Sequence, residues 1–532
     1  MTASAATPHA VQGRPSQPAP LLDRRSVLRI GASAAVLSAT AIPGPGSAAG
    51  GQIAGQDIVA LDATALSDAI RTRQVSCVEV MNAYLDQIAR VNAKVNAIVA
   101  LQDRDVLLKQ AEEKDAQLAR GEYQGWLHGF PQAIKDLEMT KGIVTTMGSP
   151  IFREFVPQTD AIVVERMRRS GAIIIGKTNV PEFGLGSQSY NPVYGTTLNA
   201  YDQSRTSGGS SGGASVAVAL HMMAVADGSD YMGSLRNPTA FNNVFGFRTC
   251  YGRVPALARD VFLPSMGVVG PIARTVPDLA MLLAVQAGYD PRVPLSIRQD
   301  PASFAGALQR DFRGVRVAWG GDFNGYLAFE PGILDLCKDA LKALEQVGCT
   351  VEKAVPDYPM DRLWHDFVTL RSWQVGSGLT DLYDDPAKRA LLKPEMIWEI
   401  ESGLKLTARD ISAASAGRSA WYQAFQQLLS RYEYFVLPSA QVFPFDAQTH
   451  WPAKISGRQM DTYHRWMEVV APITMSGCPA LNVPVGFNPQ GLPMGMQIVG
   501  RNEAELSCLQ LAAAYDQATG WVTRRKPPLL PG

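Results

Sequence analysis

The chain has 532 residues, with 49 basic and 49 acidic side chains and 46% hydrophobic residues. This composition is typical of a globular protein and excludes disorder over most of the length. A net charge of zero argues against a protein whose main partner is DNA or RNA, because such proteins carry basic faces. Six scattered cysteines without a C-x-x-C pair favour neither a zinc cluster nor a disulfide scaffold.

The first fifty residues have the features of an export signal. Arg24 and Arg25 precede a weakly apolar stretch that starts at Ile30 and ends by Pro43, and small residues at 47–49 offer a cleavage site. This order is typical of twin-arginine signals, and the apolar stretch is too short to span a bilayer. We therefore expect a disordered N-terminus with a twin-arginine-type signal peptide over residues 1–49. The protein would be exported, to the periplasm or the medium, without stable membrane association. The alternative is a tail that contains Arg-Arg by chance.

The remaining residues, 50–532, show no linker and no repeat. Ser76 and Glu79 have the spacing of a capping box and open an amphipathic helix. Further helices are expected over about 104–120, 160–170, 331–347 and 415–431. Short apolar runs of strand length lie at 97–101, 172–175, 483–485 and 496–499. Alternating helices and fully apolar strands predict an α/β fold, with one large domain and helices on both faces of a sheet.

Two motif matches lack the structural context that they need. Residues 171–178 fit the phosphate-binding pattern G-x-x-x-x-G-K-[ST], but their middle residues form a strand-like run and Pro181 discourages the required helix. Residues 209–213 fit G-x-S-x-G around Ser211, but a polar loop over 198–206 precedes them instead of the strand of a nucleophile elbow. Neither match predicts a nucleotide site or a strand-borne nucleophile.

The stretch 207–215 has a third interpretation. It is rich in Gly and Ser and leads into 216–220, where small residues begin a helix. A loop that enters a helix offers free backbone N–H groups, which suit an anion or an oxyanion. A flexible linker is the simpler alternative, but this run lies between apolar segments inside the domain.

Three separated motifs give the chain a resemblance to the amidase signature family. They are Gly-Gly-Ser-Ser-Gly-Gly at 208–213, a second serine, Ser234, 24 positions after Ser210, and Lys135, 75 positions before Ser210. Similar segments extend the resemblance over most of the chain, at 176–179, 246–248, 434–438, 477–480 and 491–497. The resemblance implies a mixed, mostly parallel, twisted central sheet. It also implies hydrolysis of the C–N bond of a linear amide without a metal or other cofactor.

The resemblance assigns roles to the residues of these motifs. Ser234 would be the nucleophile, and Ser210, joined to Gly209 by a cis peptide bond, would relay its proton to Lys135 as the base. Lys135 would then have to be neutral near pH 7, and burial is able to lower the pKa of a lysine from ~10.4 by several units. Backbone N–H groups would form the oxyanion hole, at Tyr231, Met232, Gly233 and Ser234. Three further residues would brace the site, namely Ser211, Asp230 and Arg236.

Met232 departs from the pattern, because the family usually has glycine at this position. A positive φ would strain a methionine there. Either the loop differs slightly from that of the family, or Met232 forms a wall of the acyl pocket.

The resemblance leaves the substrate open among primary amides, aryl acylamides, peptide amides, fatty amides, carbamates and esters. The expected partner is a small-molecule amide and no nucleic acid, and the chain would be a monomer or a homodimer. Three alternatives remain at this point: a carbamate or ester hydrolase on the same triad, an amidotransferase A-type subunit, and a catalytically inactive binding protein.

Overall fold

The computed structural model describes residues 55–263 and 266–531. The signal peptide expected over residues 1–49 lies outside this part of the chain. Within it, no helix combines the length and the apolar character that crossing a membrane requires.

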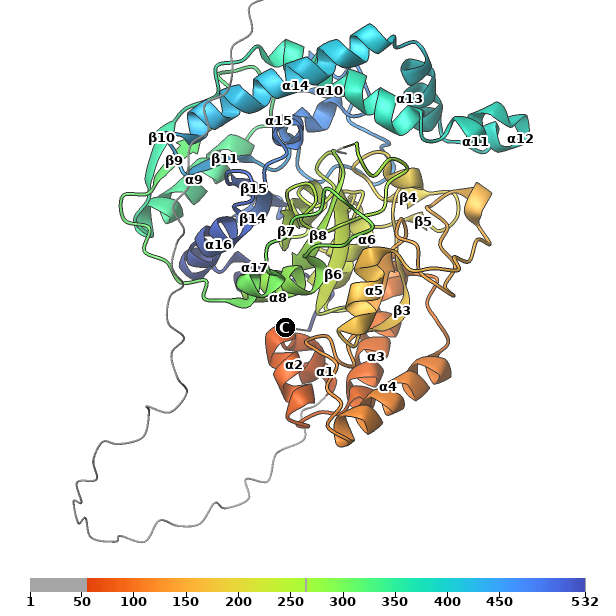
Figure 1. Cartoon of the computed structure of the whole chain (residues 1–532). Coiled ribbons are helices and arrows are strands. Elements are labelled where there is room, and N and C mark those ends of the chain that lie inside the picture. Colours follow the sequence, from red (N-terminus) through yellow and green to blue (C-terminus); the bar gives the residue numbers. More distant parts are fainter. Residues whose placement is uncertain (1–54, 264–265, 532) are drawn as a thin grey trace, which may run out of the picture. The chain divides into compact units, whose positions relative to one another are not determined.

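Four helices begin the described chain and lie together at one end of it, at the bottom of Figure 1. They are α1 (Gly55–Ala60), α2 (Ala63–Arg71), α3 (Cys77–Val95) and α4 (Arg104–Ala119). The predicted capping box forms at the start of α3. The Glu79 N–H donates to Ser76 Oγ at 3.0 Å, and the Ser76 N–H donates to Glu79 Oε2 at 2.8 Å. The apolar face of α3 is buried, as its sequence period predicts.

A small sheet of three strands lies beside these helices. Its strand order is β1 (Ile98–Val99), β3 (Ile173–Thr178) and β2 (Pro131–Lys135). β2 runs parallel to β3, and β1 runs antiparallel to it. β3 occupies the last six residues of the G-x-x-x-x-G-K-[ST] match, so these residues form a strand and not a phosphate-binding loop, as expected.

The main sheet has eight strands in the order β10-β9-β11-β15-β14-β7-β8-β6. Their bounds in that order are Thr350–Lys353, Arg316–Trp319, Tyr434–Pro438, Pro493–Val499, Ala480–Phe487, Phe245–Arg248, Val268–Ala273 and Val225–Asp230. The runs expected at 483–485 and 496–499 are β14 and β15, near the middle of this sheet. Lys135 at the end of β2 meets β6 at the sheet edge, where its N–H donates to Asp227 Oδ2 at 3.2 Å.

The α/β class, the single large domain and the mixed sheet are confirmed, but the expectation of a mostly parallel sheet is wrong. In the main sheet only β10–β9 and β9–β11 are parallel pairs, whereas the other five pairs are antiparallel. Strands buried on both faces are apolar throughout in either direction, so their pattern does not reveal direction. The short connection over 488–492 joins β14 to β15 and imposes an antiparallel pair.

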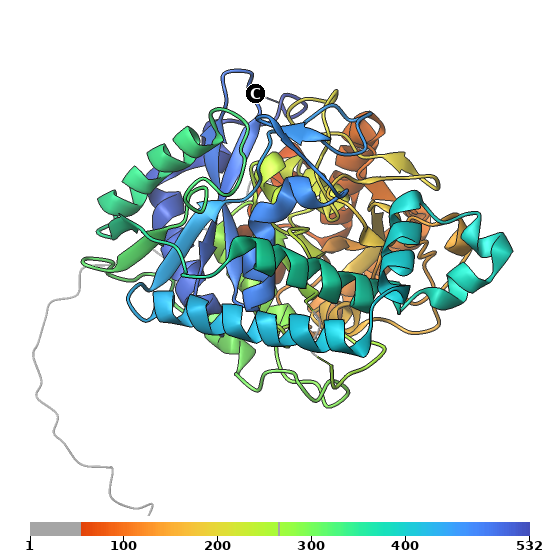
Figure 2. The same ribbon diagram turned by 90° about the horizontal axis from the view of Figure 1, so that it is seen from above.

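Helices pack on the main sheet and around it. Those that contact its strands include α6 (Gly212–Ala219), α7 (Asn237–Phe241), α8 (Val276–Gln286), α9 (Ile333–Gln346), α16 (Glu505–Thr519) and α17 (Trp521–Arg524). Figure 2 shows a second group of helices in front of the sheet, which pack mainly on one another and whose short pair at 380–389 projects to one side. It comprises α10 (Met360–Arg371), the π-helical turn η4 (Ser372–Gly376), α11 (Thr380–Asp384), α12 (Pro386–Arg389), α13 (Pro394–Leu404), α14 (Ala408–Leu429) and α15 (Ala471–Ser476).

The predicted helices are present, with shifted ends. The expected segments 104–120, 160–170, 331–347 and 415–431 correspond to α4, α5 (Ile162–Arg169), α9 and α14. α14 starts earlier than expected because Thr407 and Asp410 form a second capping box. The remaining short elements are η1 (Pro150–Phe152), η2 (Glu182–Gly184), η3 (Pro301–Ala305), η5 (Arg465–Val470) and the strand pairs β4 (Tyr190–Asn191) with β5 (Gly195–Thr196) and β12 (Lys454–Ile455) with β13 (Arg458–Gln459).

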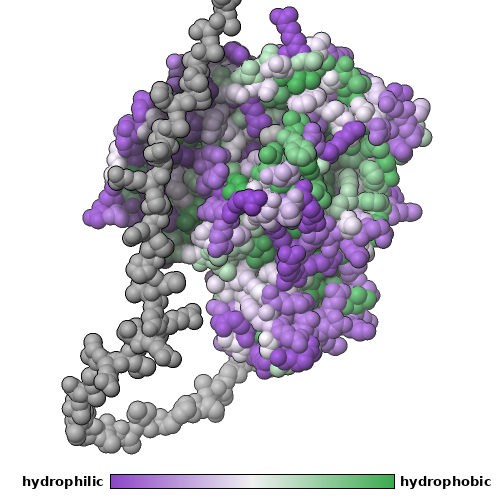
Figure 3. All heavy atoms as spheres, in the orientation of Figure 1, coloured by the Kyte–Doolittle hydropathy of each residue, from purple (hydrophilic) through white to green (hydrophobic). Residues whose placement is uncertain are grey.

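The face seen in Figure 3 is hydrophilic over the N-terminal helices and carries apolar side chains above them.

Candidate active site

Lys135 ends β2 with a fully buried side chain that reaches three serines. Its Nζ lies 2.8 Å from Ser210 Oγ, 2.8 Å from Ser211 Oγ and 2.9 Å from Ser229 Oγ, with the Ser229 carbonyl oxygen at 3.2 Å. No carboxylate oxygen of the described chain pairs with this amine within 4.0 Å. Hydroxyl and carbonyl groups can form hydrogen bonds with a neutral amine as well as with an ammonium ion.

Burial lowers the pKa of Lys135 from 10.5 to about 7. Negative charge on Glu138, Asp227 and Asp230 opposes this shift, without approaching the amine closely enough to form an ion pair. A substantial fraction of the lysine is therefore uncharged at neutral pH. This protonation state is the one that a general base needs.

The glycine-rich loop before α6 places Ser210 against this amine. The peptide bond between Gly209 and Ser210 is cis, as the resemblance implies. The Ser187 hydroxyl donates to the Gly209 carbonyl at 2.6 Å. The Ser211 N–H donates to the Ser234 carbonyl at 3.3 Å, so this loop and the loop that follows β6 lie side by side. The two loops that carry the expected catalytic serines are therefore neighbours, with Lys135 beside them.

The loop after β6 carries the residues expected to form the oxyanion hole. The backbone N–H groups of Tyr231, Met232 and Ser234 have no acceptor within the described residues. The Gly233 N–H, in contrast, donates to Asp230 Oδ1 at 2.9 Å. Three of the four expected donors are therefore free for a ligand, whereas Gly233 shapes the loop through its bond to Asp230.

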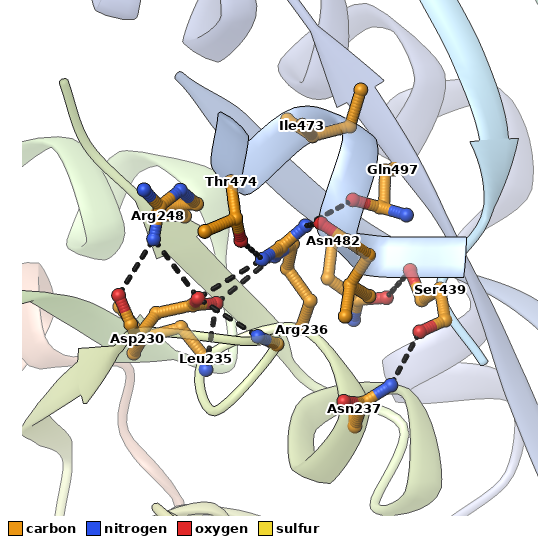
Figure 4. Close-up of polar contacts among 12 residues, drawn as sticks. Asp230, Leu235, Arg236, Asn237, Arg248, Ser439, Ile473, Thr474, Asn482 and Gln497 are labelled. Carbon is orange, nitrogen blue, oxygen red and sulfur yellow. Dashed lines mark hydrogen bonds and ion pairs between the residues drawn. The ribbon is translucent and has the colours of Figure 1, made fainter. Parts of the chain in front are cut away.

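A buried ion-pair network holds this loop in place (Figure 4). Arg236 Nε and NH2 each donate to the Asp230 carboxylate at 2.9 Å, and Arg248 NH1 donates to Asp230 Oδ1 at 3.1 Å. Burial opposes ionisation of Asp230, but the two guanidinium charges outweigh it and hold the pKa of Asp230 well below its usual range. All five N–H groups of Arg236 have acceptors, because the other three reach the Val470 carbonyl, Gln497 Oε1 and Thr474 Oγ1.

A second chain of hydrogen bonds ties the same loop to the centre of the main sheet. Asn237 Nδ2 donates to the Ser439 carbonyl at 2.6 Å, and the Ser439 hydroxyl donates to Asn482 Oδ1 at 2.6 Å (Figure 4). Asn482 Nδ2 donates in turn to the Val244 carbonyl at 3.0 Å. Residues far apart in the sequence thus hold the backbone at 231–236 in one geometry.

Met232 adopts the position that the family gives to glycine without the strain considered above. Its φ is not positive, because the left-handed residue of this loop is Gly233, with φ +86°. The Met232 side chain is buried in the main hydrophobic cluster. The loop therefore accommodates methionine by packing it into the core.

The sequence alone did not identify Ser229 and Asp227 as members of the site. Ser229 contacts the Lys135 amine through both its hydroxyl and its carbonyl, and Asp227 accepts the Lys135 N–H. The two residues are separated by one position on β6, so they share a face of that strand. This two-residue period was the available signal, but using it required the knowledge that β6 packs beside the end of β2.

Gly233→Ala is expected to distort the oxyanion loop. An added Cβ would lie 2.2 Å from Asn237 Oδ1 and 2.9 Å from Val470 Cγ2, at a φ of +86° that alanine disfavours. We expect kcat/KM for an amide to fall by about 100-fold or more, comparable to losing one oxyanion donor.

Gly325→Ala is the matched control, because Gly325 has φ +87° and nothing within 4 Å of the added Cβ. Steady-state kinetics of both variants on one anilide measure the effect. Equal activity of the two variants would show that the close approach at Gly233 has no role.

Comparisons with known proteins agree with this geometry. A family model described as Amidase matches residues 79–509. The chain is 32% identical over 474 residues to an acylamidase from Rhodococcus erythropolis, with 88% of this chain and 98% of the relative covered. It is 32% identical over 470 residues to the A-type subunit of the glutamyl-tRNA(Gln) amidotransferase from Thermosynechococcus vestitus, covering 84% and 96%. The crystal structure of a bacterial aryl acylamidase superposes with a TM-score of 0.81 at 27% identity, covering 87% and 96%.

Proposed function

The chain belongs to the amidase family, and we propose that it cleaves the C–N bond of a linear carboxylic amide through an acyl-enzyme on Ser234. As a member with acylamidase relatives, it is an amide-hydrolysing enzyme. One observation supports the proposed roles of the serines and the lysine. The Lys135 amine is buried, its hydrogen-bond partners are uncharged, and Ser210 Oγ lies 2.8 Å from it.

The first step would be a proton relay. Neutral Lys135 accepts the proton of the Ser210 hydroxyl, while Ser210 Oγ accepts the proton of Ser234. Ser234 Oγ then attacks the carbonyl carbon of the amide. Since a serine hydroxyl is a weak nucleophile, removal of its proton during attack lowers the barrier.

The second requirement is stabilisation of the tetrahedral oxyanion. The free N–H groups of Tyr231, Met232 and Ser234 support this role, because donors fixed in advance need no reorganisation when the charge develops. The fully satisfied Arg236 and the ionised Asp230 hold these groups in place. Each such donor contributes about 3 kcal/mol to transition-state stabilisation in related sites.

Breakdown of the intermediate completes the cycle. The proton held by Lys135 returns through Ser210 to the departing amine nitrogen, the C–N bond breaks, and the acyl group stays on Ser234. Water then attacks the ester, giving its proton to the same relay, and the carboxylic acid leaves with Ser234 regenerated. Each proton transfer in this cycle uses the same three side chains.

A hydrolysis screen tests the proposal. We expect the purified chain to hydrolyse at least one class among anilides, aliphatic primary amides, peptide amides, carbamates and esters, and Ser234→Ala to abolish turnover. A fluorophosphonate probe should label Ser234, which also distinguishes an enzyme from an inactive binding protein. Turnover that persists in Ser234→Ala, or a chain that neither turns over nor labels, would overturn the assignment.

The activity should rise with pH around neutrality. Since burial sets the pKa of Lys135 to about 7 and the neutral amine is the active form, kcat/KM should increase about tenfold per pH unit below 7 and level off above it. A pH profile of kcat/KM on a neutral anilide measures this. A plateau that extends down to pH 5 would contradict a lysine base.

Asp227→Asn should shift that profile. Burial raises the pKa of Asp227 well above its usual range, so its negative charge develops mainly toward the upper end of the profile. There this charge raises the pKa of Lys135, and its removal should move that part of the rise of kcat/KM to lower pH. The asparagine oxygen still accepts the Lys135 N–H, which limits structural damage. Asp311→Asn, at an exposed ion pair with Arg313, is the control and should leave the profile unchanged. A shift of the Asp227→Asn profile to higher pH would contradict the assigned electrostatics.

An amidotransferase A-type subunit is the second candidate, because one of the relatives described above is a protein of this kind. The zero net charge of the chain speaks against close contact with tRNA. Release of ammonia from glutamine or asparagine by the purified chain would favour the amidotransferase subunit. Hydrolysis of anilides or peptide amides, without activity on either amino acid, would favour the amidase.

We also propose that the protein is exported through the twin-arginine route. The support is the order of Arg24 and Arg25, the apolar stretch after them and the small residues at 47–49. Expressed in a bacterium with this route, the chain should appear outside the cytoplasm with an N-terminus near residue 50. The double substitution Arg24→Lys and Arg25→Lys should retain it inside. Identical distribution of both forms would refute the proposal.

A further inference from the structure

Three surface hollows adjoin one another beneath the loop formed by residues 254–263. The first, of about 280 Å³, contains Ser229 and Tyr231 of the active site and extends to Ala258. The second, of about 560 Å³, shares Ala258 with the first and reaches Trp373 and Gln374. The third, of about 400 Å³, shares Trp373 and Gln374 with the second. The three hollows therefore share wall residues in a row that begins at Ser229 and Tyr231 and ends at the third hollow.

The third hollow is lined by one face of α14. The residues that face it are Ser415, Arg418, Ser419, Tyr422 and Gln423, spaced as neighbours on a helix surface. A different face of α14, which includes Trp421 and Phe425, packs in the core. The stripe at 415–423 is therefore polar where it borders an open space, and it offers hydroxyl and amide groups suited to a polar ligand.

Arg418 is the one charged residue among those that line the third hollow. Its Nε donates to the Met475 carbonyl at 3.1 Å, and its NH1 and NH2 groups have no hydrogen-bond or ion-pair partner within the described chain. Burial lowers the pKa of Arg418, with only the Tyr231 phenol opposing the shift, so no carboxylate compensates the charge. A partly buried guanidinium without a counter-ion is costly unless a ligand provides one.

The third hollow is coupled to the active site through two contacts. Gln374, on the π-helical turn η4, accepts the Tyr231 hydroxyl at 2.8 Å and also lines this hollow. Met475, whose carbonyl binds Arg418, belongs to α15, and Thr474 of the same helix accepts Arg236 NH2 at 3.0 Å. A ligand at Arg418 thus lies on the same rigid elements that hold the oxyanion loop.

We propose that Arg418 binds a carboxylate at the far end of an elongated amide substrate, whose scissile bond lies at Ser234. This inference rests on the proposed function and adds the substrate class to it. The end of the guanidinium, with NH1 and NH2 free, matches the two oxygens of a carboxylate. Trp373 and Tyr422 provide apolar surface for the chain or ring that carries the carboxylate. Uncharged amides of the same shape bind less tightly because Arg418 then stays unpaired.

Paired substrates test the proposal. One series consists of anilides of dicarboxylic acids of increasing length, with the carboxylate on the acyl half. The other consists of N-acyl ω-amino acids, with the carboxylate on the amine half. Each compound has a neutral counterpart in which a methyl ketone replaces the carboxylate. We expect wild-type KM to be at least tenfold lower for the anionic member of a pair of matching length, and the preferred series shows on which half the carboxylate lies.

Arg418→Gln should reduce this preference to about one by raising the KM of the anionic member of each pair, and Arg418→Lys should restore part of the preference. Arg313→Gln removes the same charge at an exposed site and should keep the full preference. Fluorophosphonate labelling of Ser234 in each variant checks that the site is folded. Equal KM within all pairs in the wild type, or a preference that survives Arg418→Gln, would overturn the carboxylate site while neutral amides are still hydrolysed. Failure to hydrolyse any amide would instead overturn the proposed function, and this inference with it.

Discussion

Lys135→Ala is expected to lower kcat/KM on an amide by about 10⁴-fold or more, the loss seen when a base is removed from a serine triad. The reason is that Ser210 and Ser234 then have no group to take their protons, since the other neighbours of the Lys135 amine are hydroxyl and carbonyl oxygens. The value of kcat/KM and the rate constant for fluorophosphonate labelling should fall together, because both reactions need the activated Ser234.

Lys114→Ala is the matched control. Lys114 is a second lysine whose pKa is lowered by burial, but its amine contacts Gln124 and none of the three serines. We expect the activity of this variant to stay within about twofold of the wild type, because the Lys114 amine contacts none of the groups of the site. A Lys135→Ala variant that folds and retains wild-type turnover would remove the lysine from the mechanism.

Asp230→Asn is expected to destabilise the fold by about 3–5 kcal/mol, because it leaves Arg236 and Arg248 buried without their shared counter-ion. The loss should appear as a lower midpoint in urea unfolding. The two arginines lower the pKa of Asp230 strongly, so Asp230 is ionised at neutral pH and contributes its full stability there. This contribution is lost only in strong acid, as the pH falls through the lowered pKa of Asp230. Asp68→Asn, which breaks an exposed pair with Arg71, should cost under ~1 kcal/mol. Equal effects of the two substitutions would contradict the role of the buried network.

The resemblance carried by these motifs was sufficient to predict that Ser210 and Ser211 lie beside the Lys135 amine, whereas the role of Ser234 stays a prediction. Asp227 and Ser229 were not predicted because their position depends on the contact between β6 and β2, which are far apart in the sequence. The direction of the strands escaped for a related reason, since a strand buried on both faces has the same apolar pattern in either direction. The Gly233 N–H was expected to be free, and only the placed Asp230 carboxylate shows that it is already bound.

Met232 illustrates how tertiary structure resolves a local conflict. From the sequence, a methionine at a glycine position implied either strain or an altered loop. The structure gives the positive φ to Gly233 and buries the methionine side chain, so the loop at 231–234 needs no second glycine. This outcome depends on how the surrounding core packs against the Met232 side chain, which no local motif encodes.

The pH dependence of Ser234 labelling tests the central claim most directly. The rate constant for reaction with a fluorophosphonate, followed by mass spectrometry of the peptide that contains Ser234, should rise about tenfold per pH unit up to about pH 7 and then level off. In Lys135→Ala this step should disappear together with most of the rate. A rate that does not change between pH 5 and pH 9, or a label that settles on a residue other than Ser234, would contradict the account.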